Sequence, residues 1–329
     1  MALPTASLKM LQARAALTQG LREFFIAQGY WEVETPLISQ DVCVDQWLDP
    51  VAVPVGSGQV RYLQTSPEFA MKRLLVAGAE AIFQFTKAIR SLERGPRHNP
   101  EFTMLEWYRV GDTDQDQMNF TERLVRAAVR LAQANGAGCQ VQLPEQPFER
   151  VAYDTAFERA IGTRVLQQNA DELRSLADSL GVRVQAPETL DRDAWLNLIL
   201  AERVEPWIAQ QGAVFLHDFP ASQAALARVR HESPPVAERF ELYIGGVELC
   251  NGYHEITDAS ELRRRMENQA ALRARERLSA LPVESHLETA MRHGYPASAG
   301  VALGYDRLLM WLWGCEAIDQ VIAFPWEIA

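Results

Sequence analysis

Charged and aromatic residues are concentrated in residues 90–109, a segment that begins and ends with arginine. Residues 82–90 and 101–109 are predicted to form the two strands of a hairpin, because their side chains alternate in character. Alternation places four side chains on one face of the second strand: Phe102, Met104, Glu106 and Tyr108. The connecting loop carries two arginines and a histidine, which suits a polyanion such as a triphosphate. The hairpin therefore predicts a phosphate-binding loop beside an aromatic ring and a carboxylate.

A second segment, residues 241–255, contains two glutamates on either side of a tight turn. The dipeptide Gly245-Gly246 is typical of a two-residue hairpin turn, which here would pair Tyr243 with Glu248. In that register Glu241 lies on the same face as Glu248, as a diagonal neighbour about 7 Å away. Two carboxylates at this distance repel each other unless they share a cation, and hard divalent ions prefer such ligands. The segment therefore predicts a site for a hard divalent cation, or, for either glutamate alone, a solvated face.

The end of the same segment requires an irregular strand. Strict alternation would place Asn251, Tyr253 and Glu255 on the face opposite Glu248. If both sets of side chains face one cavity, a bulge or bend around residues 250–252 must turn the strand.

Two further segments carry residues that suit ligand binding. Residues 300–313 are predicted to form a strand, a tight turn and a buried helix; Gly304 permits close approach of a ligand, and Arg307 can lie over a base. Ser66 is predicted to cap a helix that has Pro67 at its first position. Glu68 then either favours the helix dipole or lines a pocket, and both interpretations are open.

The composition of the 329 residues excludes several classes of protein. Forty-three acidic against 32 basic residues give a net charge of −11, which disfavours an extended nucleic-acid footprint. The four cysteines show no metal-binding spacing and no disulfide framework, and no apolar run is long enough to span a bilayer. We therefore expect a cytoplasmic protein with no membrane partner.

The remaining pattern indicates one continuous domain of the α+β class, with a helical insertion over roughly residues 113–212. A strand is expected at residues 31–36, and an arginine run near residue 270 is either a docking face or simply solvated. Four helices are expected, at residues 7–28, 115–134, 191–211 and 257–278.

The string RHNPEFTMLEWY at residues 97–108 resembles motif 2 of the class II aminoacyl-tRNA synthetases, in the form found in lysyl-tRNA synthetases. Residues 7–36 resemble motif 1, and residues 300–307 resemble motif 3. The resemblance implies the class II catalytic core, an antiparallel β-sheet flanked by helices, and a homodimer formed through motif 1.

The resemblance also implies the ligands and their residues. Arg90 and Arg307 are the implied catalytic residues: Arg90 holds the α-phosphate and the substrate carboxylate, and Arg307 sandwiches adenine against Phe102. Glu241 and Glu248 are the implied Mg²⁺ ligands. The implied ATP site consists of Arg90, Ser91, Leu92, Glu93, His98, Asn99, Phe102, Glu248, Leu249, Gly304 and Arg307. At Leu92 the sequence departs from the family, which usually has an acid there.

The implied amino-acid pocket is rich in carboxylates, which suits a substrate with two ammonium groups. At Ala302 the sequence departs from the synthetases, which commonly carry glycine there. The implied pocket residues are Ser66, Pro67, Glu68, Glu106, Tyr108, Asn251, Tyr253, Glu255 and Ala302.

Residues 219–228, FPASQAALAR, and the absence of room for an anticodon-binding domain resemble the stand-alone paralogues of lysyl-tRNA synthetase. Those proteins activate β-lysine with ATP and transfer it to a lysine of elongation factor P, with no tRNA. Two other hypotheses stay open: an enzyme of the same core that acts on tRNA or a free amine, and a non-catalytic sensor.

Overall fold

The computed structural model describes residues 3–56, 58–91, 93–135 and 138–329. The chain forms two compact units. Unit 1 consists of residues Met1–Pro144 and Glu255–Ala329, and unit 2 is the intervening segment Glu145–His254. Each unit has its own strands, helices and buried side chains.

Unit 1 contains a mainly antiparallel set of strands. β5 pairs with β1 in parallel and with β6 antiparallel, and β6 pairs antiparallel with β12. The members of this set are β1 (Trp31–Glu32), β5 (Ala81–Ile89), β6 (Glu101–Val110) and β12 (Ser298–Gly304). A smaller antiparallel sheet is formed by β2 (Ile38–Ser39), β4 (Val60–Leu63) and β3 (Ala52–Pro54).

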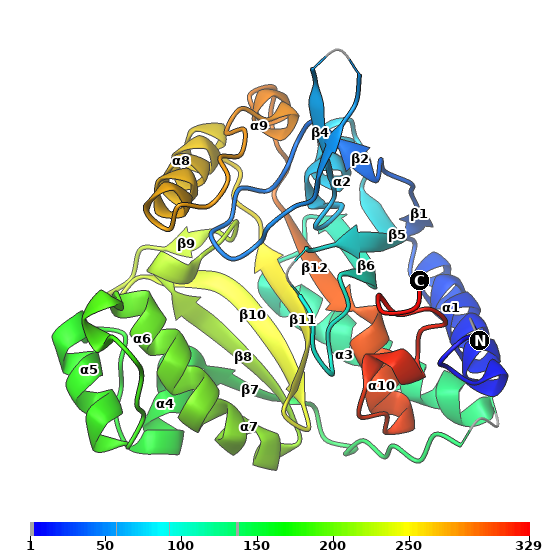
Figure 1. Cartoon of the computed structure of the whole chain (residues 1–329). Coiled ribbons are helices and arrows are strands. Elements are labelled where there is room, and N and C mark those ends of the chain that lie inside the picture. The colour runs from blue at the N-terminus through cyan, green and yellow to red at the C-terminus, as the bar shows by residue number, and fades with distance from the viewer. Residues whose placement is uncertain (1–2, 57, 92, 136–137) are drawn as a thin grey trace. The chain divides into compact units, whose positions relative to one another are not determined.

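Helices cover these strands, and α1 packs against α3 (Figure 1). Ser7 caps α1 by accepting from the N–H of Met10, and Thr113 and Asp116 form a capping box at the start of α3. Phe25 of α1 stacks on Phe83 of β5 with ring centroids 4.5 Å apart. The helices of unit 1 are α1 (Leu8–Ala27), α2 (Glu68–Val76), α3 (Asp114–Ala134), α8 (Ala259–Arg275), α9 (His286–Met291), α10 (Tyr305–Trp313) and the 3-10 helix η4 (Ile318–Gln320).

Unit 2 contains a second set of strands, in the order β11, β10, β8 and β7, with the short β9 beside β10. Neighbours are antiparallel except for the parallel pair β7 and β8. These strands are β7 (Glu149–Ala152), β8 (Ala213–Pro220), β9 (Val229–Arg230), β10 (Val236–Ile244) and β11 (Val247–His254).

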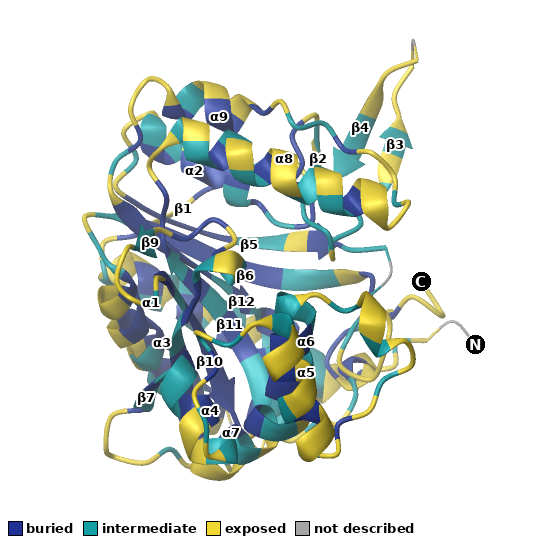
Figure 2. Cartoon of the chain, turned by 90° about the vertical axis from the view of Figure 1, so that its left-hand side faces the viewer, coloured by how far each residue is buried: buried dark blue, intermediate teal, exposed yellow. Residues whose placement is uncertain are grey.

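The helices of unit 2 bury an apolar face that includes Trp195, Phe157 and Leu173, and their outer faces are exposed (Figure 2). The helix expected at residues 191–211 is present but contains one π-helical turn, Leu200–Val204. These elements are α4 (Tyr153–Ile161), α5 (Ala170–Ser179), η1 (Pro187–Thr189), α6 (Arg192–Ile199), α7 (Glu205–Gln211) and η3 (Ala221–Gln223).

The predicted elements are present with shifted ends. The motif 1 strand is shorter than expected, because only Trp31–Glu32 pair as a strand. The helix expected to have Pro67 at its first position begins one residue later, at Glu68. The expected helical insertion includes a strand, β7. Among the described residues, no helix combines the length and the apolar character that crossing a bilayer requires.

Candidate functional site

The face of β6 predicted from alternation is present in unit 1. Glu106 lies opposite Gln84 of β5 on one side and opposite Ala302 of β12 on the other. Tyr108 has Gly300 as its β12 partner. Partners across a sheet point to the same face, so β6 and β12 present these residues together.

Glu106 is the buried centre of a group of carboxylates and hydroxyls. Ser66 donates to its Oε1 at 2.6 Å, and Tyr108 donates to its Oε2 at 3.0 Å. Burial and the nearby charge of Glu68 raise the pKa of Glu106 to about 7 despite these two donors. Ser66 also accepts a hydrogen bond from the backbone N–H of Glu68 at 3.0 Å, which fixes the start of α2 beside the carboxylate.

Lys72 lies in the same group, and the sequence analysis did not identify it. Its Nζ is 2.5 Å from a carboxylate oxygen of Glu68 and 2.5 Å from one of Glu255. The spacing of four residues between Glu68 and Lys72 was the available signal, but on most helices this spacing marks a surface ion pair. Here the side chain of Lys72 is only 3% exposed.

Gly300 leaves room for two of these side chains. A Cβ at this position would lie 2.2 Å from the Tyr108 ring and 3.0 Å from Oε1 of Glu255, so glycine is required. Oε1 of Glu255 is buried and has no hydrogen-bond partner among the described residues. The pKa of Glu255 is raised to about 8, mainly by burial and also by the neighbouring charges of Glu68 and Glu106. Lys72 opposes this shift.

Arg90, at the end of β5, lies over the ring of Phe102, with 5.1 Å between Cζ and the ring centroid. Its Nη1 donates to Glu93 at 3.0 Å. Ser91 is held by Asp49, whose backbone oxygen accepts from both the N–H and the hydroxyl of Ser91. Leu92, assigned to the ATP site from the sequence, lies outside the described residues. Arg90 is therefore beside the ring that is predicted to bind adenine.

Arg307 is in the first turn of α10, directly after Gly304 at the end of β12. Its Nη2 lies 2.6 Å from Nε2 of His98 in the motif 2 loop. Burial and the charge of Arg307 lower the pKa of His98, so the neutral imidazole accepts this hydrogen bond. The neighbouring Asp306 binds Arg14 and the backbone N–H of Thr103, which fixes the start of the helix against β6.

Asn99 has a structural role in addition to its predicted place in the ATP site. The side chain accepts from the backbone N–H of Trp326 at 2.9 Å and donates to the backbone oxygen of Glu101 at 2.6 Å. Arg94 lies over the Trp326 ring at 5.0 Å. The C-terminal segment therefore holds both ends of the motif 2 loop.

The hairpin in unit 2 has the predicted register and the predicted irregularity. Tyr243 pairs with Glu248 and Ile244 with Val247, and both turn glycines have positive φ, at 58° and 77°. The register then shifts by one residue, so that the next pair is Leu242 with Cys250. The bulge is therefore at Leu249, one residue before the predicted range.

The bulge brings the predicted residues of the hairpin onto one face. Beyond it, Asn251 pairs with Glu241 and Tyr253 pairs with Arg239. Since Glu241 and Tyr243 alternate on one face of β10, their partners Asn251 and Glu248 share that face. Without the extra residue, Asn251 and Tyr253 would point to the opposite side, as the sequence analysis inferred.

Arg239 is a second residue that the sequence analysis missed. Its Nη2 donates to Glu241 at 2.5 Å, and its Nε donates to Asn251 at 3.3 Å. Tyr243 donates to the other oxygen of Glu241 at 2.6 Å. The guanidinium also lies over the Phe219 ring at 4.3 Å. Glu241 is thus a buried carboxylate whose charge is already stabilised within β10.

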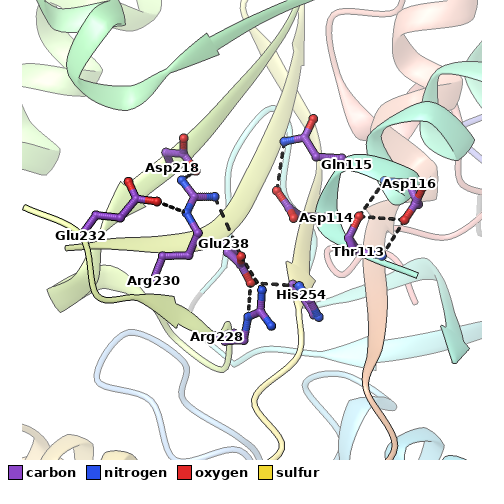
Figure 3. A network of polar contacts seen from close by, with 10 residues as sticks. All are labelled: Thr113, Asp114, Gln115, Asp116, Asp218, Arg228, Arg230, Glu232, Glu238 and His254. Atoms are coloured by element: carbon purple, nitrogen blue, oxygen red, sulfur yellow. Dashed lines mark hydrogen bonds and ion pairs between the residues drawn. The ribbon is translucent and has the colours of Figure 1, made fainter. Parts of the chain in front are cut away.

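His254 also belongs to a structural group in unit 2. Figure 3 shows Glu238 of β10 between Arg228 and His254, with Nδ1 of His254 2.9 Å from the carboxylate. Burial alone would raise the pKa of Glu238, but hydrogen bonds from His254 and Arg228 lower it to about 2. The imidazole therefore orients the end of the hairpin.

The arginine run of α8 is largely used within unit 1. Arg264 and Arg265 pair with Glu261, and Arg263 pairs with Glu267. Arg273 is buried and donates to the backbone oxygens of Asp45, Leu48 and Ser279 and to the carboxylate of Asp49. Arg273 therefore joins α8 to the segment before β3, whereas the pairs of Arg263, Arg264 and Arg265 with Glu261 and Glu267 lie within the helix.

The family model described as tRNA synthetases class II (D, K and N) matches residues 4–327. A protein of Vibrio vulnificus named elongation factor P–(R)-β-lysine ligase is 42% identical over 99% of this chain and 98% of its own length. Proteins of the same name from Vibrio cholerae and Salmonella arizonae are 41% and 42% identical, over 99% and 98% of this chain and 98% and 96% of their own lengths.

Proposed function

This chain belongs to the class II tRNA synthetases of the D, K and N group, and we propose that it uses ATP to activate (R)-β-lysine and transfers the product to a lysine side chain of elongation factor P. The fold is the class II catalytic core, and the enzyme is an ATP-dependent ligase. The similarity to the named ligases extends over nearly the whole of both chains, which supports the choice of substrate and acceptor.

A group of buried, charged side chains in unit 1 is the observation that carries the amino-acid assignment. Three carboxylates, those of Glu68, Glu106 and Glu255, are grouped there with one ammonium. A substrate with two ammonium groups supplies the missing positive charge, whereas a monoamino acid leaves a buried carboxylate without a partner. The pocket therefore favours lysine or β-lysine over amino acids with neutral side chains.

The reaction has two steps. An oxygen of the substrate carboxylate attacks the α-phosphorus of ATP, the bond to the β-phosphate oxygen breaks, and pyrophosphate leaves an acyl-adenylate. The deprotonated amine of the acceptor lysine then attacks the acyl carbon, forming an amide and releasing AMP. Arg90 orients the carboxylate and α-phosphate, while Arg307 and Phe102 hold adenine, so positioning and charge stabilisation carry the first step.

Glu241 and Glu248 are proposed to hold Mg²⁺, and Leu249 and Gly304 to contact ATP through the backbone. The hairpin places both carboxylates on one face, and carboxylate oxygens are suitable ligands for this ion. Bound Mg²⁺ neutralises phosphate charge. Arg239 and Tyr243 hold the carboxylate of Glu241 in place through hydrogen bonds.

We also propose that the protein is a cytoplasmic homodimer. Several apolar side chains of the motif 1 region of unit 1 are exposed, which is typical of a surface that another subunit covers. The exposed residues include Ile26, Trp31, Leu37 and Ile38.

The test is amino-acid-dependent exchange of pyrophosphate into ATP, measured with α-lysine, (R)-β-lysine and (S)-β-lysine. We expect the highest kcat/KM with (R)-β-lysine. Elongation factor P is then incubated with the enzyme, ATP and each isomer, and its intact mass is measured. A gain of one lysyl group supports the acceptor; exchange without any gain in mass, while a tRNA or a free amine is acylated, would identify a different acceptor.

A further inference from the structure

Lys72 is an unusual cation in this chain. The sequence has only three lysines, Lys9, Lys72 and Lys87, and Lys72 is buried with 2% of its surface exposed. Burial opposes its charge, yet Glu255 and Glu68 raise the pKa of Lys72 well above its ordinary value. The pocket therefore contains a permanent ammonium ion of its own.

The charges around Lys72 do not balance. Three carboxylates, those of Glu68, Glu106 and Glu255, share this one ammonium. Burial raises the pKa of Tyr108 and of Tyr295, so both phenols are neutral. Arg90, whose Nε lies 3.4 Å from the backbone oxygen of Thr65, is already paired with Glu93. With every carboxylate ionised, the group is two positive charges short.

One atom of this group indicates where a ligand donor fits. Oε1 of Glu255 is buried and has no hydrogen-bond partner among the residues that the structure describes. A buried acceptor without a donor is unfavourable, so the oxygen is a suitable partner for a ligand ammonium. An ammonium group beside Glu106 or Glu255 favours the ionised form of that carboxyl.

We propose that Lys72 determines substrate specificity: it is a resident counter-ion that neutralises one of the three carboxylates, so that two remain for the two ammonium groups of a diamino acid. This inference depends on the proposed amino-acid activation and adds the residue that sets its charge requirement. A monoamino acid fills only one of the two places, and the buried charge left over opposes its binding.

A double-mutant cycle tests the charge count. Glu255→Gln removes one negative charge and leaves a pocket suited to one ammonium. Lys72→Met removes the counter-ion and leaves an excess carboxylate. The combined variant, Lys72→Met with Glu255→Gln, restores the original balance without the ion pair. The measurement is the ratio of kcat/KM, in pyrophosphate exchange, for (R)-β-lysine over 3-aminoheptanoic acid, which has a methyl group in place of the terminal ammonium.

We expect Glu255→Gln to lower this preference by at least about tenfold, and the combined variant to recover it to within about threefold of the unmodified protein. Lys87→Met is the matched control, because Lys87 forms an exposed ion pair with Glu101 at 3.3 Å; its preference should not change. Circular dichroism and the Kd for ATP verify that each variant is folded.

A folded combined variant whose preference is no higher than that of Glu255→Gln would overturn the proposal, since Lys72 would then serve only to hold α2. If the combined variant does not fold, Lys72→Arg replaces it: retention of the preference within about threefold supports a charge role, and a loss as large as that of Glu255→Gln refutes it. Failure of the proposed function gives a different result, because the unmodified protein would then show no exchange with any lysine isomer.

Discussion

Ala302 of β12 lies directly opposite Glu106 of β6, so its methyl group and the Glu106 side chain share one face of the sheet. Two positions earlier on the same strand, Gly300 is required by the Tyr108 ring. On this face of β12, position 302 thus carries a methyl group where position 300 has no room for one.

We expect Ala302→Gly to shift the preference from (R)-β-lysine towards α-lysine. Lysyl-tRNA synthetases, which this sequence resembles, commonly carry glycine at this position. One methyl group in a binding pocket changes discrimination by roughly tenfold, and the ratio of the two kcat/KM values in pyrophosphate exchange measures the change. A ratio equal to that of the unmodified protein would show that the methyl group does not contact the substrate.

Substrate affinity should depend on pH through the pocket carboxylates. The pKa of Glu106 is raised to about 7 and that of Glu255 to about 8, so the ionisation of both carboxyls changes near neutrality. Only the ionised carboxylates attract an ammonium group, so KM for the amino acid should fall as pH rises from 6 to about 8.5. The KM for ATP, measured in the same series, is the control.

Ionisation of Glu106, which should favour substrate binding, is expected to lower the stability of the fold. Because the pKa of Glu106 is higher in the folded state, folding favours its protonated form, and the stability that this provides is lost as pH rises through about 7. Glu106→Gln should therefore raise Tm at pH 8 more than at pH 5. An equal change in Tm at both values would contradict the raised pKa.

Much of this site could be predicted because its residues lie on strands and a hairpin turn whose side-chain alternation can be read from the sequence. The face of β6 follows from alternation, and the turn at Gly245 fixes the register of Tyr243 with Glu248. The sequence also required a bulge, since Glu248 and Asn251 could not otherwise share a face. It could not choose the bulged residue, because Leu249 and Cys250 both fit a buried strand.

Lys72 and Arg239, the two charged residues that could not be identified from the sequence, have no distinctive local pattern. Lys72 follows Glu68 at ordinary helical spacing, and its second partner, Glu255, is distant in the sequence. Arg239 is two residues before Glu241 on one strand, where an exposed pair is equally common. Both residues are identified only by the side chains that surround them, which come from several elements.

Both proposed magnesium ligands should respond to amidation. Glu248→Gln is expected to abolish pyrophosphate exchange. Glu241→Gln is expected to abolish exchange and also to destabilise the protein by roughly 1–3 kcal/mol, because the half-buried Arg239 loses its charged partner. Tm and exchange are measured for both variants, with Glu232→Gln, an exposed partner of Arg230, as the control. Normal exchange in either glutamate variant would refute the metal assignment.

Asn99 should affect both stability and ATP binding, because its amide joins the motif 2 loop to the C-terminal segment. Asn99→Ala leaves the backbone N–H of Trp326 and the backbone oxygen of Glu101 without their partner, which is expected to cost roughly 1–3 kcal/mol. The loop beside Arg90 then loses its anchor, so KM for ATP should rise by more than KM for the amino acid. Trp326→Ala keeps the backbone hydrogen bond and removes only the ring under Arg94, so it should change KM for ATP less. A larger effect from Trp326→Ala would instead assign the anchoring role to the aromatic contact.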